Sequence, residues 1–162
     1  MATSITLMDI VERFRDGIMQ DTDIPTFTNT NYGKDPLYVM GRDPRRPLGV
    51  DDSPYILVTP IGRLTGESVS QLAYTFEVEW AIRDRVFSDI NTNGAKEMQG
   101  FYKLDEFGNL IKQALYNLSY SNIIADDIDY DLQERTIYPF FVGYMIVAVQ
   151  IQDVLGGTIG LT

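Results

Sequence analysis

The chain has 162 residues, of which 13 are basic and 23 acidic, and it contains neither histidine nor cysteine. Ser-His-Asp and Cys-His catalytic sites, thiolate nucleophiles and His/Cys zinc sites are therefore excluded, which leaves carboxylates, Lys, Tyr, Ser and Thr as reactive groups. The net charge of −10 disfavours wrapping of nucleic acid over the surface and favours solubility. The length suits a single domain over residues 1–162, with an ordered core from 5 to 152.

The N-terminal part of the chain predicts one helix followed by a long loop. Apolar residues recur at helical spacing from Leu7 to Ile18, and Thr6 forms a capping pair with Asp9, which together predict a helix over residues 7–20. From 21 to 54, Pro, Gly, Asn and charged residues replace this pattern, and a loop that long is usually functional or disordered. Neither a targeting segment nor a stretch near ~18 apolar residues is present, so we expect a protein made in the cytoplasm that does not enter a membrane.

The middle of the chain predicts a hairpin with one unusually long strand. Residues 55–59 form a short apolar run that Pro60 stops, and residues 62–66 supply a turn. From Ser70 to Arg83 apolar and polar side chains alternate, which predicts a half-buried antiparallel strand. Fourteen residues at ~3.3 Å each extend about 46 Å, whereas a globule of this size is about 40 Å across. A strand longer than its domain usually packs against another copy, so we expect an assembly protein.

The remaining chain predicts a second helix and two further strands. An irregular stretch over residues 84–102 leads into a helix over 104–117, in which Gly108 is a weak point that the helix tolerates. Residues 127–136 alternate between apolar and acidic side chains, which predicts a strand whose acidic side faces water or a partner. Residues 140–151 are apolar on both faces, which is typical of a central strand or of one buried by assembly.

The predicted elements together indicate an α+β domain. We expect a sheet of about four strands, mainly antiparallel, with two helices on one face and long irregular insertions. Residues 153–162 include three glycines and are expected to form a mobile tail.

One segment matches the first half of a calcium-binding loop. Asp89, Asn91, Asn93 and Gly94 alternate oxygen ligands with a glycine that permits the sharp turn. The twelfth position, where a bidentate Glu is needed, is Gly100. The sequence therefore favours an ordinary Asn-Gly turn over a metal site, and we expect no cofactor.

Two further acidic groups contain carboxylates that could act in catalysis or metal binding. Glu77 and Glu79 lie on one face of the long strand, about 7 Å apart, which is within reach of the two-carboxylate geometry of glycosidases. An intersubunit polar surface and plain solvation are the other two interpretations. The acidic run within residues 126–131 lacks the glycine and the closing Glu of a calcium loop, so it is typical of a solvated strand face.

Arg42, Arg45 and Arg46 form the only basic cluster of the sequence. Guanidinium groups bind carboxylates or phosphates in a bidentate fork. A solvated loop is the simple interpretation, and docking against an acidic neighbour is the functional one. The glycines within residues 62–66 and 156–160 lack the Lys and the strand-to-helix context of a phosphate-binding loop.

Five features in chain order carry a resemblance to a known family. They are the amphipathic helix from Leu7 to Ile18, the Pro-Tyr-Ile-Leu-Val strand at 54–58 after a long loop, the long strand with Tyr74-Thr-Phe-Glu-Val, the helix from Asp105 to Leu115, and the aromatic strand from Tyr138 to Ile151. In these features the chain resembles the tail-terminator, or tail-completion, proteins of long-tailed bacteriophages. The segment 21–54 departs from the family pattern.

The resemblance implies a structural protein of the virion. Such proteins form hexameric rings that cap the tail tube, stop its polymerisation and present a surface to the head connector, while DNA passes through the lumen without specific binding. The partners would be further copies of the chain, the tail tube protein and the connector, and no enzymatic activity is implied. The alternatives are a head-side neck or stopper protein, a calcium- or carbohydrate-binding module, and a carboxylate-dependent hydrolase.

Overall fold

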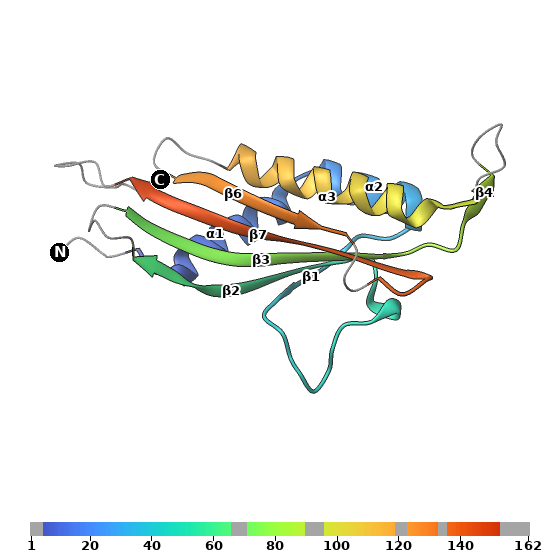
Figure 1. The fold of residues 1–162 in the computed structure, drawn as a ribbon, viewed down its shortest axis with the longest axis horizontal. Coiled ribbons are helices and arrows are strands. Elements are labelled where there is room, and N and C mark those ends of the chain that lie inside the picture. The colour runs from blue at the N-terminus through green and yellow to red at the C-terminus, as the bar shows by residue number, and fades with distance from the viewer. Residues whose placement is uncertain (1–4, 66–70, 90–95, 119–122, 133–135, 153–162) are drawn as a thin grey trace.

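The computed structural model describes residues 5–65, 71–89, 96–118, 123–132 and 136–152 (Figure 1). In chain order the elements are α1 (Leu7–Gln20), α2 (Asp23–Tyr32), β1 (Leu37–Met40), the 3-10 helix η1 (Val50–Asp52), β2 (Tyr55–Thr65), β3 (Gln71–Arg83), β4 (Phe87–Asp89), β5 (Lys96–Met98), α3 (Gln99–Asn117), β6 (Ile123–Asp131) and β7 (Phe140–Gln152). The predictions made for Asn91 to Gly94, for the side chains between Asp126 and Asp129, and for the tail at 153–162 lie outside the described residues.

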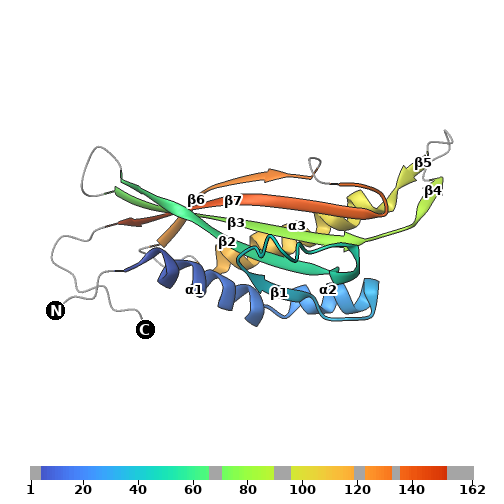
Figure 2. The ribbon, with the colours of Figure 1, turned by 90° about the horizontal axis from the view of Figure 1, so that it is seen from below.

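The fold is α+β, as the sequence predicts. Five strands form one mixed sheet in the order β1-β2-β3-β7-β6, and β4 pairs with β5 in a separate two-stranded ribbon. Only the β1–β2 pair is parallel. Within the described part of the chain the three α-helices share one apolar core with one face of the sheet (Figure 2). The prediction of about four strands and two helices is therefore short by one strand and one helix.

The first helix confirms the prediction from the sequence, because its signals are local. The backbone N–H of Asp9 donates to Oγ1 of Thr6 at 3.2 Å, and the N–H of Thr6 donates to Oδ2 of Asp9 at 2.7 Å. This reciprocal capping box satisfies donors that the first turn leaves without partners. The apolar stripe of the helix is buried at Ile10, Val11, Phe14 and Ile18.

The predicted long loop over residues 21–54 is wrong, since it contains α2, β1 and η1. The start of α2 is held by Asp21, whose Oδ1 accepts hydrogen bonds from the backbone N–H groups of Asp23 and Ile24 at 2.9 and 3.0 Å. The helix ends at Gly33, whose φ of 71° is a conformation that favours glycine. A Thr- and Asn-rich helix and a four-residue strand carry too weak a period to be predicted, and tertiary packing forms them.

Three strand and helix boundaries also differ from the predictions. β2 does not stop at Pro60 but continues to Thr65 through an irregularity between Pro60 and Gly62. Proline is tolerated there because β1 pairs with β2 only as far as Val58, so β2 has an unpaired edge beyond that point. The stretch over 84–102 contains β4, β5 and the start of α3, and the acidic strand runs over Ile123–Asp131 instead of 127–136.

The core is built around Trp80, which is fully buried on the helix face of β3. Its Nε1–H donates to the backbone oxygen of Leu104 at 3.0 Å, which ties α3 to the sheet. A Cβ atom added to Gly143 would lie 2.6 Å from Cε2 of Trp80, and one added to Gly108 would collide with the indole ring and with the hydroxyl of Tyr130. Gly108 is therefore required by the close approach of helix and sheet, and is not a merely tolerated weak point.

We expect Gly108→Ala to lower the free energy of unfolding by about 1–3 kcal/mol, the usual cost of forcing atoms into a packed core. The sign of this change distinguishes the two cases, because Gly→Ala in a helix without such a contact raises the free energy of unfolding by about 1 kcal/mol. Urea denaturation followed by the fluorescence of the single tryptophan measures the change.

Gly62→Ala is the matched control, since nothing lies within 4 Å of the Cβ it would add. We expect this variant to be neutral or slightly more stable. A stabilising Gly108→Ala would show that the helix does not pack against Trp80 as described.

Candidate functional site

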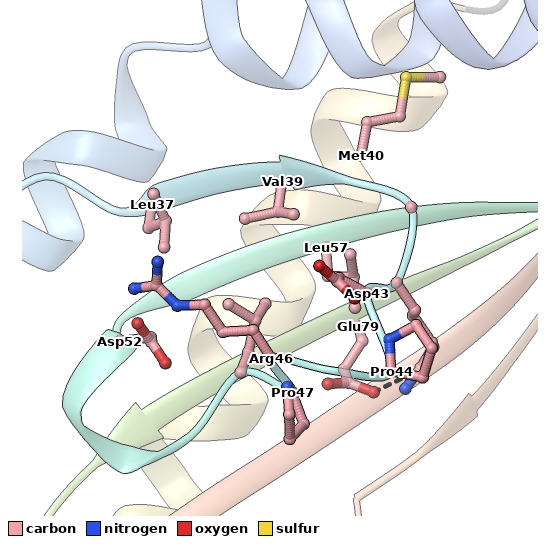
Figure 3. A pocket seen from close by; sticks show the side chains of 13 residues that line it. Leu37, Val39, Met40, Asp43, Pro44, Arg46, Pro47, Asp52, Leu57 and Glu79 are labelled. Atoms are coloured by element: carbon pink, nitrogen blue, oxygen red, sulfur yellow. Dashed lines mark hydrogen bonds and ion pairs between the residues drawn. The ribbon is translucent and has the colours of Figure 1, made fainter.

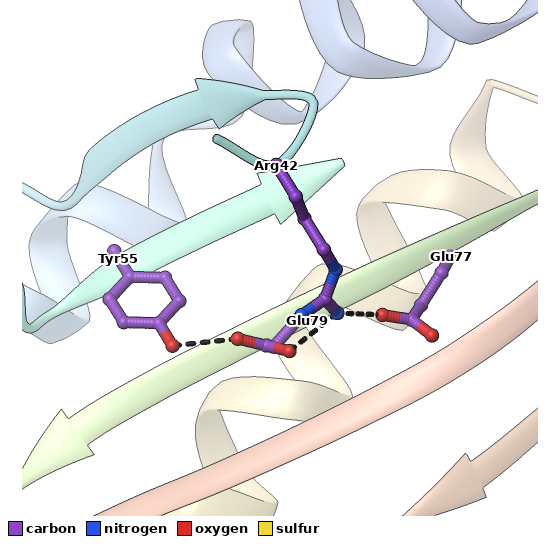
Figure 4. A network of polar contacts seen from close by, with 4 residues as sticks. All are labelled: Arg42, Tyr55, Glu77 and Glu79. Atoms are coloured by element: carbon purple, nitrogen blue, oxygen red, sulfur yellow. Dashed lines mark hydrogen bonds and ion pairs between the residues drawn. The ribbon is translucent and has the colours of Figure 1, made fainter. Parts of the chain in front are cut away.

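A network of polar side chains lies on the sheet face that the helices do not cover (Figure 4). Nη2 of Arg42 donates to Oε1 of Glu77 and, at 2.7 Å, to Oε2 of Glu79. The hydroxyl of Tyr55 donates to Oε1 of Glu79, also at 2.7 Å. One guanidinium nitrogen therefore bridges two carboxylates, and the inner carboxylate has a second donor.

The strand period brings these four residues together. Phe76, Val78 and Trp80 of β3 point to the helices, so Glu77 and Glu79 must point to the other face. Glu79 is paired in register with Leu57 of β2, two residues along the strand from Tyr55, so both of these residues share its face.

Arg42 reaches the network because the chain reverses direction directly after β1. Gly41 has a φ of 82°, a conformation that favours glycine. The N–H of Gly41 donates to the backbone oxygen of Val58 at 2.8 Å, which anchors the reversal on β2. From this point the side chain of Arg42 extends over the face of the sheet to both carboxylates (Figure 4).

The exposure of the charged side chains in the network decreases from Arg42 through Glu77 to Glu79. The side chain of Arg42 is 43% exposed, that of Glu77 is 16% exposed and that of Glu79 is 6% exposed. Desolvation lowers the pKa of Arg42, but the charge of Glu79 and the hydrogen bonds of both carboxylates outweigh it, so the pKa is raised above its ordinary value. The guanidinium is therefore held as a cation, which compensates the buried carboxylate of Glu79.

A groove of about 800 Å³ lies beside the network, between the sheet and the loop that follows β1 (Figure 3). Its apolar lining includes Leu37, Val39, Leu48 and Leu57, and Glu79 also lines it. Leu57 also belongs to a second, smaller apolar cluster on this face, against which Val39 and Leu48 pack. The loop therefore covers part of the sheet face by apolar contact as well as by the charge of Arg42.

The other two arginines of the predicted cluster belong to the same loop, and both are exposed. Arg45 is 89% exposed in its side chain and binds Asp43, whose pKa is lowered by the side-chain hydrogen bond and then by the backbone hydrogen bond of Arg45. Arg46 is exposed and lines the groove. Its guanidinium makes no ion pair with any other residue that the structure describes.

Of the five residues that the sequence singled out, the structure brings together Arg42, Glu77 and Glu79. Their pairing lies within one chain, which sequence reasoning did not predict. Tyr55 was also missed, because a tyrosine in a short apolar strand is usually a core residue. The strand register supplies the missing signal for Tyr55. It places Leu57 opposite Glu79, and Tyr55 lies two residues from Leu57 and therefore on the same face.

Among the described residues no group of three or more Asp or Glu side chains is placed to hold a metal ion. None of the helices that the structure describes is long and apolar enough to cross a membrane.

No protein-family model matches the chain, and no curated protein matches it.

We expect Arg42→Ala to lower the free energy of unfolding by about 1–3 kcal/mol, since it leaves the buried Glu79 without its cation. The same change made in a Glu79→Gln background should cost less, because no buried charge then loses its partner. Urea denaturation of the four proteins in this double-mutant cycle measures the difference.

Arg45→Ala is the control for this cycle, because its ion pair with Asp43 is exposed and such pairs contribute little to stability. Equal losses in Arg42→Ala and Arg45→Ala would mean that the bridge to Glu79 does not stabilise the fold.

Proposed function

We propose that the protein is a structural component of a long-tailed bacteriophage, which closes into a ring at the head-proximal end of the tail tube. The ring, most simply a hexamer, stops polymerisation of the tube and joins the tail to the head connector. Its partners are further copies of the chain, the tail tube protein and the connector, and DNA passes through its lumen without specific binding. The protein then belongs to the virion and is made in the cytoplasm of the bacterial host.

The observation that carries the proposal is the central strand pair. β3 and β7 pair without interruption from Gln71 with Gln152 to Arg83 with Phe140, which makes thirteen register pairs. At ~3.4 Å per residue this ladder extends about 44 Å, which matches or exceeds the about 40 Å expected for a compact globule of this length. A ladder of that extent supports an assembly protein, since it offers a long surface to a neighbouring copy.

The uncovered sheet face adds support. Outside the area that the loop after β1 covers, this face carries half-buried side chains of two strands. They are Tyr144, Ile146 and Ala148 on β7, and Ala73 and Thr75 on β3. The helices share their core with the opposite face. Half-buried apolar side chains on a sheet face without a covering layer are expected where a second protein surface completes the packing.

The network around Glu79 supports a structural role over a catalytic one. Glu79 is only 5% exposed, so little of its carboxylate is open to a substrate. Both of its carboxylate oxygens accept hydrogen bonds within the chain, from Arg42 and Tyr55. A glycosidase instead directs two carboxyl groups at a bound sugar.

We expect the purified protein to sediment as one closed species larger than a monomer and to appear as rings in negative-stain images. An amber mutation in its gene should give headless particles whose tail tubes are not stopped at the normal length, and supplied wild-type protein should restore infectious phage. A protein that stays monomeric over a wide concentration range, together with tails that stop normally in its absence, would refute the proposed function.

A second expectation concerns the exposed arginines of the loop. Arg45 and Arg46 would meet an acidic partner surface, so replacing both with Ala should weaken assembly at low salt and leave the stability of the monomer unchanged. The defect should shrink at high salt, where screening already weakens the wild-type attraction. Sedimentation of both proteins at two salt concentrations tests this, and equal assembly at low salt would show that the two arginines are only solvated.

A further inference from the structure

Exposed apolar side chains gather at one end of the molecule. The described part of the chain has eleven large apolar side chains that are exposed, and six of them form what we name the end patch. The end patch consists of Val86, Phe87, Phe101, Tyr102, Ile137 and Tyr138. The remaining five belong to α1, β1, β2 and α3 and do not gather in this way. Such a concentration on a protein surface marks an interaction site.

Three rings of the end patch, those of Phe87, Phe101 and Tyr138, are connected through the buried ring of Phe141, although they come from three separate segments. The centroids of Phe87 and Tyr138 are 5.0 Å apart, and that of Tyr138 is 6.4 Å from the buried Phe141. Phe101 of α3 lies 5.1 Å from Phe141 on an edge-to-face contact. The hydroxyl of Tyr138 donates to the backbone oxygen of Arg85 at 3.3 Å. The patch is therefore a built surface with fixed ring geometry.

The ribbon of β4 and β5 supplies a second observation. It contains three register pairs, from Phe87 with Met98 to Asp89 with Lys96, and it extends beyond the end of the five-stranded sheet (Figures 1 and 2). A two-stranded ribbon is at best marginally stable in water and requires packing against another layer. Phe87, the first residue of the ribbon, remains 48% exposed in the single chain. The ribbon is therefore expected to find further packing outside the chain.

The uncovered sheet face defined above is a different apolar surface on the same chain. A closed ring is built from heterologous contacts, in which two different surfaces of each copy meet. The end patch and the uncovered sheet face are two such surfaces. Arg85 and Lys96 lie beside the end patch and make no ion pair with other described residues, and the edge strand β6 of the neighbour's sheet ends at the acidic Asp131.

From these observations we infer that the end patch and the β4–β5 ribbon of one copy dock on the uncovered sheet face of the next copy. The inference rests on the proposed ring and specifies its subunit interface. The contact places the exposed rings over Tyr144, Ile146 and Ala148, and it brings Arg85 and Lys96 toward the acidic side of the neighbour.

Site-specific crosslinking tests the contact, because the chain has no cysteine of its own. Val86→Cys and Ala148→Cys are combined in one chain and treated with a short bismaleimide. Within one chain the two positions cannot be linked, since Ala148 pairs with Thr75 and eight strand residues from there to Arg83 already extend about 26 Å. A ladder of covalent multimers is expected from the double variant and none from either single variant. Covalent dimers from Val86→Cys alone would overturn the inference, because they indicate that the patch meets itself.

Ile61 supplies the matched control, since Ile61 and Val86 are both 55% exposed and both β-branched. In the crosslinking experiment the control is Met19→Cys combined with Ala148→Cys, which should give no ladder, because Met19 is 49% exposed on α1 and that helix packs on the opposite face of the sheet. In sedimentation, Val86→Asp should weaken self-association at least tenfold, whereas Ile61→Asp should assemble like wild type. Both variants should keep the wild-type unfolding midpoint at a protein concentration at which all three proteins are monomeric.

The outcomes separate this inference from the proposed function. Rings formed equally well by wild type and Val86→Asp would overturn the interface and leave the ring intact. A wild-type protein that stays monomeric would overturn both. Loss of self-association only in Val86→Asp, together with the crosslinked ladder, supports both.

Discussion

The two-residue period of β3 is the constraint on which the rest of the structure depends. β3 is paired on both sides, with β2 and with β7, so its side chains must alternate between the two faces of the sheet. Phe76, Val78 and Trp80 enter the core beneath the helices, and Glu77 and Glu79 face the other way. A slip of one residue would place both carboxylates under the helices and the indole on the open face, so the register of this strand is strongly specified. The apolar core and the polar network therefore lie on opposite faces of β3.

Burial of Glu79 has a physical cost and therefore a structural consequence. Removing a carboxylate from water is unfavourable by several kcal/mol unless charge and hydrogen bonds compensate it. Here Arg42 and Tyr55 supply that compensation, and Arg42 can do so only if the loop after Gly41 lies across the sheet. The buried charge thus selects one loop position among the many that the apolar contacts of Leu48 alone would permit. We interpret this as a role in conformational specificity, which buried ion pairs fill in some proteins.

The elements that the sequence predicts well are those whose signals are local. A capping box and apolar spacing define α1 within one segment, and the alternation of β3 needs no other strand to be read. α2 was missed because its Thr- and Asn-rich sequence has weak helix propensity and depends on Asp21 and on stacking of Phe27 with Phe107 at 5.3 Å. The need for glycine at position 108 was missed for the same reason, since it depends on Trp80 of a different element. In the site, the charged residues could be chosen from the sequence, but their pairing depends on strand register and on a turn at Gly41, and neither is a local property.

The acidic excess and the apolar surfaces act together on assembly. With a net charge of −10, two copies repel one another at distances up to about 10 Å in ordinary salt. Apolar attraction acts only at contact, so association is productive only where local charge is reversed and apolar surface is continuous. At the end patch the rings of Phe87, Phe101 and Tyr138 are connected through Phe141, and the cations Arg85 and Lys96 beside them offset part of the local negative charge. The negative charge of the chain therefore suppresses random contacts between copies. The relative orientation of two copies is determined by the few surfaces where cations and aromatic rings lie together.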